Sequence, residues 1–452
     1  MNYYTNPFDL REISTNSPLK ILIDTDKMTI GEIETLIDVA NLNFINAVFM
    51  PTENITKKNL LSCRNLILLT QTSDDFGYTF SAKIHSKKLS FRVRCFSHLT
   101  RKYYKPNILD QLNRILEIHF CITKETYIQN NSHFTSPYTN FKDFMTKLGI
   151  LFASHNYYYS HTNSITNKGF FEDYRFHREF PEYSSLWSSI ANSHDGYSSE
   201  LQDLLNSFRN RATFLLNSYN KVQYICYKTS NNDTVRDSLF YLGYFCLLLT
   251  GILDDLSHYI AKIYNIKNAK RKIGLRNISI YKEFLKQLET SNTELYNFIT
   301  SENIQKYLEI IYPLRNTYSH NHFTNAAHPT IQLELQNNKI LETNLVSVTK
   351  ESHNNFNKAN SLFPDIQWES IKNDDKLYYY EIIDFSSNFL SFFLYFINRF
   401  FYLIREEQNI TDLSNINPEE HWLGNNSFTM YNFNRFIHLD YRYKTSNPPK
   451  IP

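Results

Sequence analysis

Cysteine and glycine are scarce in this chain of 452 residues, which contains five cysteines and nine glycines. No cysteine forms a CxxC motif or stands at zinc-ligand spacing from a histidine, which argues against a disulfide framework and a structural zinc site. No carboxylate cluster demands a metal either, so we expect no metal and no cofactor. Reduced thiols and a cytoplasmic location fit best. The cysteines are Cys63, Cys95, Cys121, Cys226 and Cys246.

An excess of charge of one sign is also missing. The formal net charge is +2, so bulk electrostatics predict no nucleic-acid partner, and any such signal must be local. The first residues have neither the basic segment nor the apolar core of a signal peptide. The apolar run 238–253 is short for a membrane span of about 20 residues, and Asn398 and Arg399 interrupt the run 389–404. We expect two buried helices and no membrane segment.

Hydrophobic residues, in contrast, make up 42% of the chain, which suits a folded globular protein. At this length two or three domains are expected. The fold class we predict is α+β, predominantly α. The predicted parts are a small α/β domain (1–105), a helical middle region (106–230), a helical bundle (231–410) and an irregular tail (411–452). The first of these could be a sensor, a regulator or an RNA-positioning domain.

Periodicity gives the elements of the first half. Short β-rich runs predict strands and a 3.6-residue repeat predicts helices, whereas the Tyr-, Ser- and Asn-rich stretch 155–196 predicts irregular structure. The predicted strands are 19–23, 47–50, 65–70, 78–84 and 89–96, the last two forming a hairpin. The predicted helices are 29–40, 108–120, 141–152 and 199–224.

Strong helical segments dominate the second half, and together they favour a bundle. Between the third and the fourth lies a strand-like insertion, 330–335 and 340–348, around a turn at 336–339, which predicts a β-hairpin. The four predicted bundle helices are 234–264, 278–287, 303–320 and 376–407.

The third bundle helix carries the residues most suggestive of chemistry. Pro313 is placed to kink or restart this helix, and Arg315-Asn316 follows it, with His320 five positions after the arginine. This R-N-x-x-x-H pattern, on a bundle helix with another helix after it, resembles the active site of HEPN ribonucleases. The family pattern allows four to six residues between the arginine and the histidine, and Arg92/His98 and Arg114/His119 also match it, but outside the predicted bundle.

The resemblance covers about residues 230–410. It implies a metal-independent endoribonuclease of the toxin or antiviral-defence kind, acting as a homodimer on RNA. It also implies a regulatory partner such as an antitoxin, and catalytic roles for Arg315, His320 and Asn316.

The chemistry explains why these residue types suit RNA cleavage. RNA can be cut by its own 2′-hydroxyl, provided that a proton is moved and the charge on the phosphate is stabilised. A histidine can move the proton, and an arginine offers a fixed, permanent charge to the phosphate. On a regular helix His322 lies closer than His320 to the side of Arg315, so His322 is a second-rank candidate. Asp254 or Asp255 could orient the pair.

Two basic stretches could contact RNA. The first spans 83–105, where aromatic residues are interleaved with basic ones, and a solvated edge hairpin is the alternative. The second surrounds the connection between the first two bundle helices, and an ordinary charged loop is the alternative. The RNA-binding candidates are Lys87, Lys88, Arg92, Arg94, Arg101, Lys102, Lys267, Lys270, Arg271, Lys272 and Arg276.

Two other functions compete with the ribonuclease. One is a noncatalytic protein that binds nucleic acid or a partner through a degenerate HEPN bundle. The other is a structural subunit of a larger complex. The basic pair at the end of a helix could also merely complement the helix dipole. The apolar surface of the fourth bundle helix, 389–403, exceeds one core stripe, so we expect either the N-terminal domain or a second subunit to cover it.

Overall fold

The computed structural model describes most of the chain, and the structural statements below concern these residues. They are 5–25, 28–42, 44–50, 66–68, 70–74, 77–84, 87–94, 104–123, 137–158, 168–192, 199–267, 272–320, 326–327, 344–362, 368–370, 372–373 and 377–408. Side chains are described for most of these residues, but not in 66–94, 104–108, 188–192, 316–320, 326–327 or 372–373, nor at positions 170, 174 and 362. The predicted class is confirmed, because the chain is α+β and mostly helical.

A five-stranded sheet organises the N-terminal part, with the strand order β3-β2-β1-β7-β8 and parallel pairing throughout. Strands β1 and β2 read LKILID and INAVFM, and such nearly continuous apolar runs suit a parallel sheet that is covered on both faces. The strands are β1 (Leu19–Asp24), β2 (Ile45–Met50), β3 (Leu66–Leu68), β7 (Phe120–Ile122) and β8 (Tyr138–Thr139).

Helices α1 (Ile30–Ala40) and α5 (Phe141–Ser154) pack their apolar residues into one core with this sheet. Both begin at residues that cap a helix well. The Thr29 hydroxyl accepts a hydrogen bond from the Glu32 N–H in a capping box, and the Asn140 side chain accepts one from Asp143. Helix α3 (Tyr104–Leu116) and the short helix η1 (Pro7–Asp9) complete this part.

The helix predicted over 108–120 is wrong at its C-terminal end. Glu117 has a φ of 52°, a left-handed conformation that stops α3, and Phe120 already begins β7 beside β1. The parallel sheet therefore includes strands from beyond residue 105, where we drew the domain boundary.

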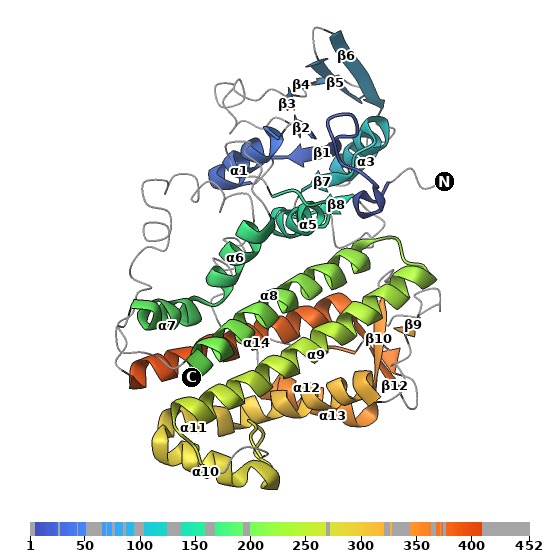
Figure 1. Ribbon diagram of the computed structural model, residues 1–452. Coiled ribbons are helices and arrows are strands. Elements are labelled where there is room, and N and C mark those ends of the chain that lie inside the picture. The colour runs from blue at the N-terminus through green and yellow to red at the C-terminus, as the bar shows by residue number, and fades with distance from the viewer. Residues whose placement is uncertain are drawn as a thin grey trace.

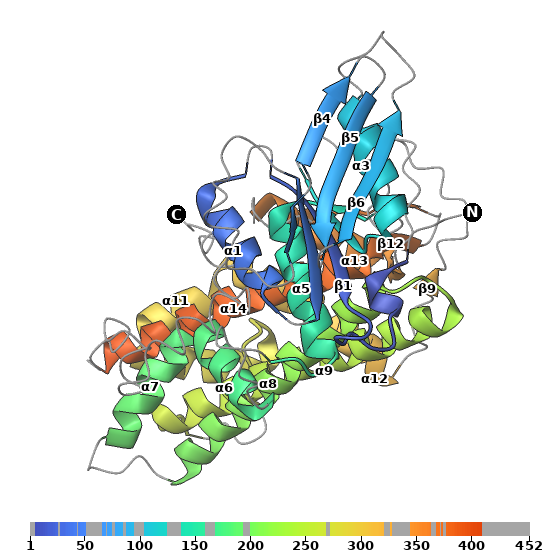
Figure 2. The same cartoon turned by 90° about the horizontal axis from the view of Figure 1, so that it is seen from above.

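A second, antiparallel sheet contains β4 (Thr70–Asp74), β5 (Gly77–Ile84) and β6 (Lys87–Arg94). The register pairs Tyr78 with Val93 and Ile84 with Lys87, which confirms the predicted hairpin. Figure 2 shows these strands projecting beyond the parallel sheet.

Long helices form the other half (Figure 1). Helices α8 and α9 lie side by side, and α14 runs behind them, with α12 on the other flank of α9. The helices are α6 (Lys168–Glu179), α7 (Pro181–Asn192), α8 (Ser199–Tyr227), α9 (Asn232–Ile263), α10 (Lys282–Ser291), α11 (Thr293–Thr300), α12 (Glu302–His320), α13 (Lys350–Leu362) and α14 (Ile382–Glu407), with the short helix η3 (Ser279–Tyr281) before α10.

Two predictions fail in this half. The stretch 155–196 contains α6 and α7 rather than irregular structure. The helix predicted over 376–407 begins only at Ile382, because residues Leu377–Glu381 (LYYYE) form β12, which pairs with β10 (Leu345–Thr349). Helix α13 follows β10 directly. The turn predicted at 336–339 lies outside the described residues. Strands β9 (Ala326–Ala327) and β11 (Lys372–Asn373) complete the third sheet, in the order β11-β12-β10-β9.

Helix α14 is the centre of the bundle core. Its phenylalanines pack against α7, α8, α9 and α11, and the Tyr307 hydroxyl donates to the Phe389 carbonyl at 3.0 Å. Neither the N-terminal domain nor a second subunit is needed to cover α14, so the argument that took its aromatic residues as a sign of outside cover is wrong. The buried residues are Phe389, Leu390, Phe392, Phe393, Phe396, Ile397, Phe400, Phe401 and Leu403.

Candidate functional site

Arg315 lies five residues before the end of α12, which packs against α9 and α13. The helix is continuous through Pro313, which lies on its exposed side. Ile304, Leu308 and Ile311 of the same helix are buried in the bundle core. The Arg315 side chain is half-buried, so it stands at the margin of the core rather than inside it.

A polar contact ties the helix to α9 one turn before Arg315. The Tyr312 hydroxyl donates to the Asp254 carboxylate at 3.0 Å, and the Arg276 guanidinium lies over the Tyr312 ring, 4.5 Å from its centroid. Burial, together with the Asp254 charge and hydrogen bond, raises the pKa of Tyr312 well above its usual value, so the hydroxyl stays a donor. Because Tyr312 and Arg315 are three residues apart, they share a side of the helix.

Asp254 and Asp255, the two acids considered as orienting groups, have different partners. Asp254 accepts from Tyr312, whereas Asp255 pairs with Arg211 at 3.2 Å and accepts from Ser207 at 3.1 Å. Burial raises the pKa of Asp255. Of the two, Asp254 is the one in contact with α12.

The other motif residues are placed only in part. Asn316 and His320 lie in the last two turns of α12, where the structure describes the backbone but not their side chains. His322 lies outside the described residues.

The structure likewise describes only some of the basic residues near the bundle. Lys267 and Lys272 are exposed, and Lys270 and Arg271 lie outside the described residues. Among the described candidates, Arg276 is brought to α12 through its contact with the Tyr312 ring.

The four described N-terminal basic residues are not brought to this site. Lys87, Lys88, Arg92 and Arg94 lie on β6, an edge strand, and Figure 1 shows that strand at the opposite end of the molecule from α12. Arg101 and Lys102 fall outside the part of the chain that the structure describes. An RNA-binding strand and a charged edge strand both remain compatible with this position.

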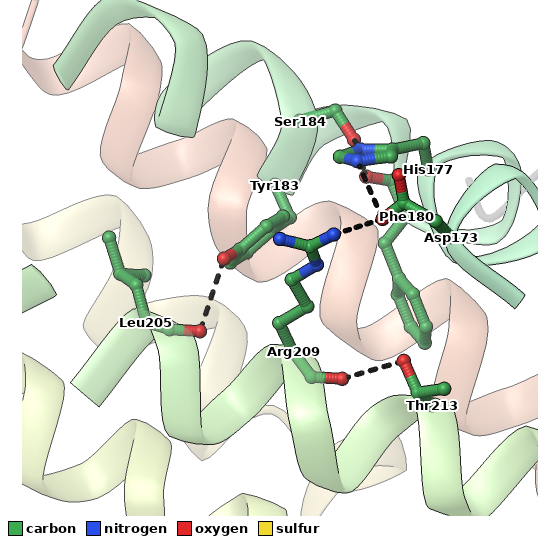
Figure 3. Close-up of polar contacts among 8 residues, drawn as sticks. All are labelled: Asp173, His177, Phe180, Tyr183, Ser184, Leu205, Arg209 and Thr213. Carbon is green, nitrogen blue, oxygen red and sulfur yellow. Dashed lines mark hydrogen bonds and ion pairs between the residues drawn. The ribbon is translucent and has the colours of Figure 1, made fainter. Parts of the chain in front are cut away.

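A second polar cluster, which the sequence did not indicate, joins α6, α7 and α8 (Figure 3). His177 Nδ1 lies 2.7 Å from the Ser184 hydroxyl, and His177 Nε2 lies 3.5 Å from the Asp173 carboxylate. Arg209 of α8 pairs with the same carboxylate. The hydrogen bond from His177, and then the charges of His177 and Arg209, lower the pKa of Asp173.

Serine, histidine and aspartate in this order also occur in enzymes with a nucleophilic serine. Here the Ser184 hydroxyl donates to the Phe180 carbonyl, 3.0 Å away and one turn earlier in the chain. One hydroxyl proton cannot serve both that carbonyl and His177, and Arg209 shares the Asp173 carboxylate. The cluster is therefore best explained as contacts that hold three helices together.

Within the described residues, no group of three or more His, Cys, Asp or Glu side chains could hold a metal ion. One described helix, α9, is long and apolar enough to cross a membrane, and 56% of its most apolar window is buried inside the protein. Comparison of the chain with family models, with curated proteins and with solved structures finds no match.

Proposed function

We propose that the protein is a metal-independent endoribonuclease of the HEPN type, of the toxin or antiviral-defence kind. The observation that supports this most is the position of Arg315. It is a half-exposed arginine near the end of a bundle helix, with Tyr312 and Asp254 fixing the turn before it and His320 five residues after it.

In the proposed reaction the RNA 2′-oxygen attacks the neighbouring phosphorus. The P–O2′ bond forms and the P–O5′ bond breaks, leaving a 2′,3′-cyclic phosphate and a free 5′-hydroxyl. His320 accepts the 2′-hydroxyl proton or returns a proton to the 5′-oxygen, and Arg315 stabilises the negative charge on the phosphate. Asn316 is a further contact to the phosphate, and His322 is the second candidate for the proton transfer.

Other groups would support this reaction without contacting the reacting atoms. Asp254 and Tyr312 hold the backbone that carries Arg315. Arg276, Lys267 and Lys272 would give the RNA a positive approach. The proposal includes action as a homodimer, which would supply two arginines and two histidines at one phosphate, as well as a cytoplasmic location and control by a partner protein such as an antitoxin.

The test incubates the purified full-length protein with total RNA in excess chelator and maps the new ends. We expect cyclic or 3′-phosphate ends, loss of cleavage in Arg315→Ala and His320→Ala, and a smaller effect of His322→Ala. Arg114→Ala is the matched control, because Arg114 stands at the same spacing from His119 but lies on α3. Strict dependence on a divalent metal would refute the mechanism. Full activity of His320→Ala with none in His322→Ala would reassign the proton transfer.

One observation favours the noncatalytic alternative. The basic strand β6 is remote from α12, so it could bind RNA without delivering it to Arg315. A salt-dependent affinity for RNA that survives Arg315→Ala, in a protein that never cuts RNA, would support that function instead.

A further inference from the structure

One face of α8 carries basic side chains that no acid balances. Lys221, Tyr224 and Lys228 follow one another at steps of three and four residues, so they form a stripe along the helix. Lys221 is exposed and Lys228 is half-buried. Within the described residues, neither lysine takes part in an ion pair. The stripe therefore presents uncompensated positive charge.

The end of α5 adds a histidine to this stripe. His155, the residue that caps α5, lies with its ring centroid 6.4 Å from that of Tyr224. The Lys228 ammonium lies 4.8 Å from the centroid of the same tyrosine ring. The Tyr224 hydroxyl donates to the Phe8 carbonyl at 3.3 Å, which fixes the ring between these two groups.

Helix α6 adds a third lysine. Lys168 pairs with Glu172 at 3.4 Å, and the Asn217 side chain of α8 donates to Glu172 at 2.8 Å. Asn217 lies one turn before Lys221, so Lys168 is held beside the start of the stripe. Figure 1 shows α5 and α6 on the side of α8 that faces away from α12. We call Lys168, Lys221 and Lys228 the α8 basic patch.

The basic groups of this region repel one another. Burial, followed by the charges of Lys228 and Lys221, lowers the pKa of His155. Burial, followed by the charges of Lys168 and Lys228, lowers the pKa of Lys221. A bound anion would replace this repulsion by attraction.

Acids at both ends of the patch limit the size of its ligand. Glu172 lies at the α6 end, and Asp9 accepts from the N–H and the hydroxyl of Thr229, the residue directly after Lys228. The two lysines of α8 are about 10 Å apart along the axis, at a rise of 1.5 Å per residue. An extended RNA strand would meet these carboxylates, whereas a compact anion fits between them.

We propose that the α8 basic patch binds a small anion that carries linked phosphate groups. The three ammonium groups would donate to its phosphate oxygens, a common role of lysine. Tyr224 and Tyr227 pack against the core of the α/β part, so the ligand would lie where this part meets the bundle and would stabilise their contact. The site does not rest on the proposed ribonuclease, because α12 lies on the far flank of α9.

The test is a calorimetric titration of the full-length protein with pyrophosphate. The variant is Lys221→Gln/Lys228→Gln. The matched control is Lys282→Gln/Lys286→Gln, which removes two exposed lysines of α10. We expect binding by the wild type and an unchanged affinity in the control. The variant should bind at least about tenfold more weakly, because hydrogen bonds between charged groups are among the stronger ones.

A second measurement follows the His155 ring by NMR over a pH series, with its signal assigned by its loss in His155→Gln. Without ligand, the pKa of His155 should be higher in Lys221→Gln/Lys228→Gln than in the wild type, because two positive neighbours are gone. Saturating pyrophosphate should raise the pKa of His155 in the wild type, because the anion stabilises the charged ring.

A wild type that does not bind pyrophosphate, or that binds it no more tightly than Lys221→Gln/Lys228→Gln does, would overturn the proposal. So would a pKa of His155 that pyrophosphate leaves unchanged. Two further arms use a short RNA oligonucleotide and vesicles that contain a phosphoinositide. If the variant abolished binding of either one, and pyrophosphate did not compete with it, the patch would belong to that ligand instead. Because pyrophosphate binding is measured without RNA, failure of RNA cleavage would refute the ribonuclease alone.

Discussion

Protonation of His119 should weaken the N-terminal α/β part as the pH falls. His119 is buried between α3 and β7, and its Nδ1 accepts the Lys20 backbone N–H at 2.9 Å. Burial, followed by the Lys20 charge, lowers the pKa of His119 from 6.5 to about 4. The neutral ring is therefore part of the pairing between β1 and the start of β7.

The sign and size follow from proton linkage. An unfolded chain binds a proton at His119 below pH 6.5, but the folded protein does so only near pH 4. The stabilisation is therefore complete above pH 6.5 and is lost as the pH falls toward 4. The difference in pKa corresponds to about 3 kcal/mol.

His119→Asn is the matched variant, because the Asn Oδ1 can accept the same N–H but does not titrate. Hydrogen exchange of the β1 and β7 amides, read by mass spectrometry at a series of pH values, gives the opening free energy of this part. Wild type should lose about 3 kcal/mol more than His119→Asn between pH 6.5 and 4. Identical pH dependence in the two proteins would refute the reasoning.

Two further predictions concern the bundle. Phe389→Ala should lower the free energy of unfolding by about 3–5 kcal/mol, because Phe389 is fully buried against Tyr307 and Trp368. A loss below 1 kcal/mol in chemical denaturation would show that the core is not packed as described. Asp173→Asn should reduce the loss of bundle stability on acidification below about pH 4. The pKa of Asp173 is lowered in the folded protein, so its ionised carboxylate stabilises the fold above the pKa of the unfolded chain, and this stabilisation is lost as the pH falls. The same fall in melting temperature with pH in wild type and variant would contradict this.

Much of the fold could be predicted where one signal dominates. The apolar runs of β1 and β2, together with the capping box of Thr29 and Glu32 at the start of α1, predict the strand-helix-strand order of the N-terminal α/β part. Helices α8, α9 and α12 were predicted with ends within a few residues of those in the structure, because the 3.6-residue apolar repeat persists over many turns in each of them.

Other elements depend on contacts that the sequence does not reveal. Phe120 continues the apolar period of α3, and only its pairing with β1 makes it a strand residue. Phe176, Phe180 and Tyr183 bury α6 and α7 in the bundle, although the composition around them favours irregular structure. Helices α9 and α14 are both strongly apolar, and only the packing shows that α14 is covered whereas α9 keeps an exposed stripe.

The candidate site was predictable as a motif but not as a set of contacts. Arg315 stands out from its neighbours in sequence, and its helix was expected. That Tyr312 binds Asp254 and lies under Arg276 follows from how α12 packs on α9, and no spacing encodes it.

The most direct test of the account compares wild type and Arg315→Ala on one RNA oligonucleotide that the wild type cuts, in excess chelator. We expect the cleavage rate of Arg315→Ala to be lower than that of the wild type by about 10²–10³-fold, the usual effect of removing one group that stabilises charge in the transition state. A 2′-deoxy substitution at the cut site should block cleavage, because it removes the attacking oxygen. Equal rates for the two proteins, or wild-type cleavage at the 2′-deoxy position, would contradict the central claim.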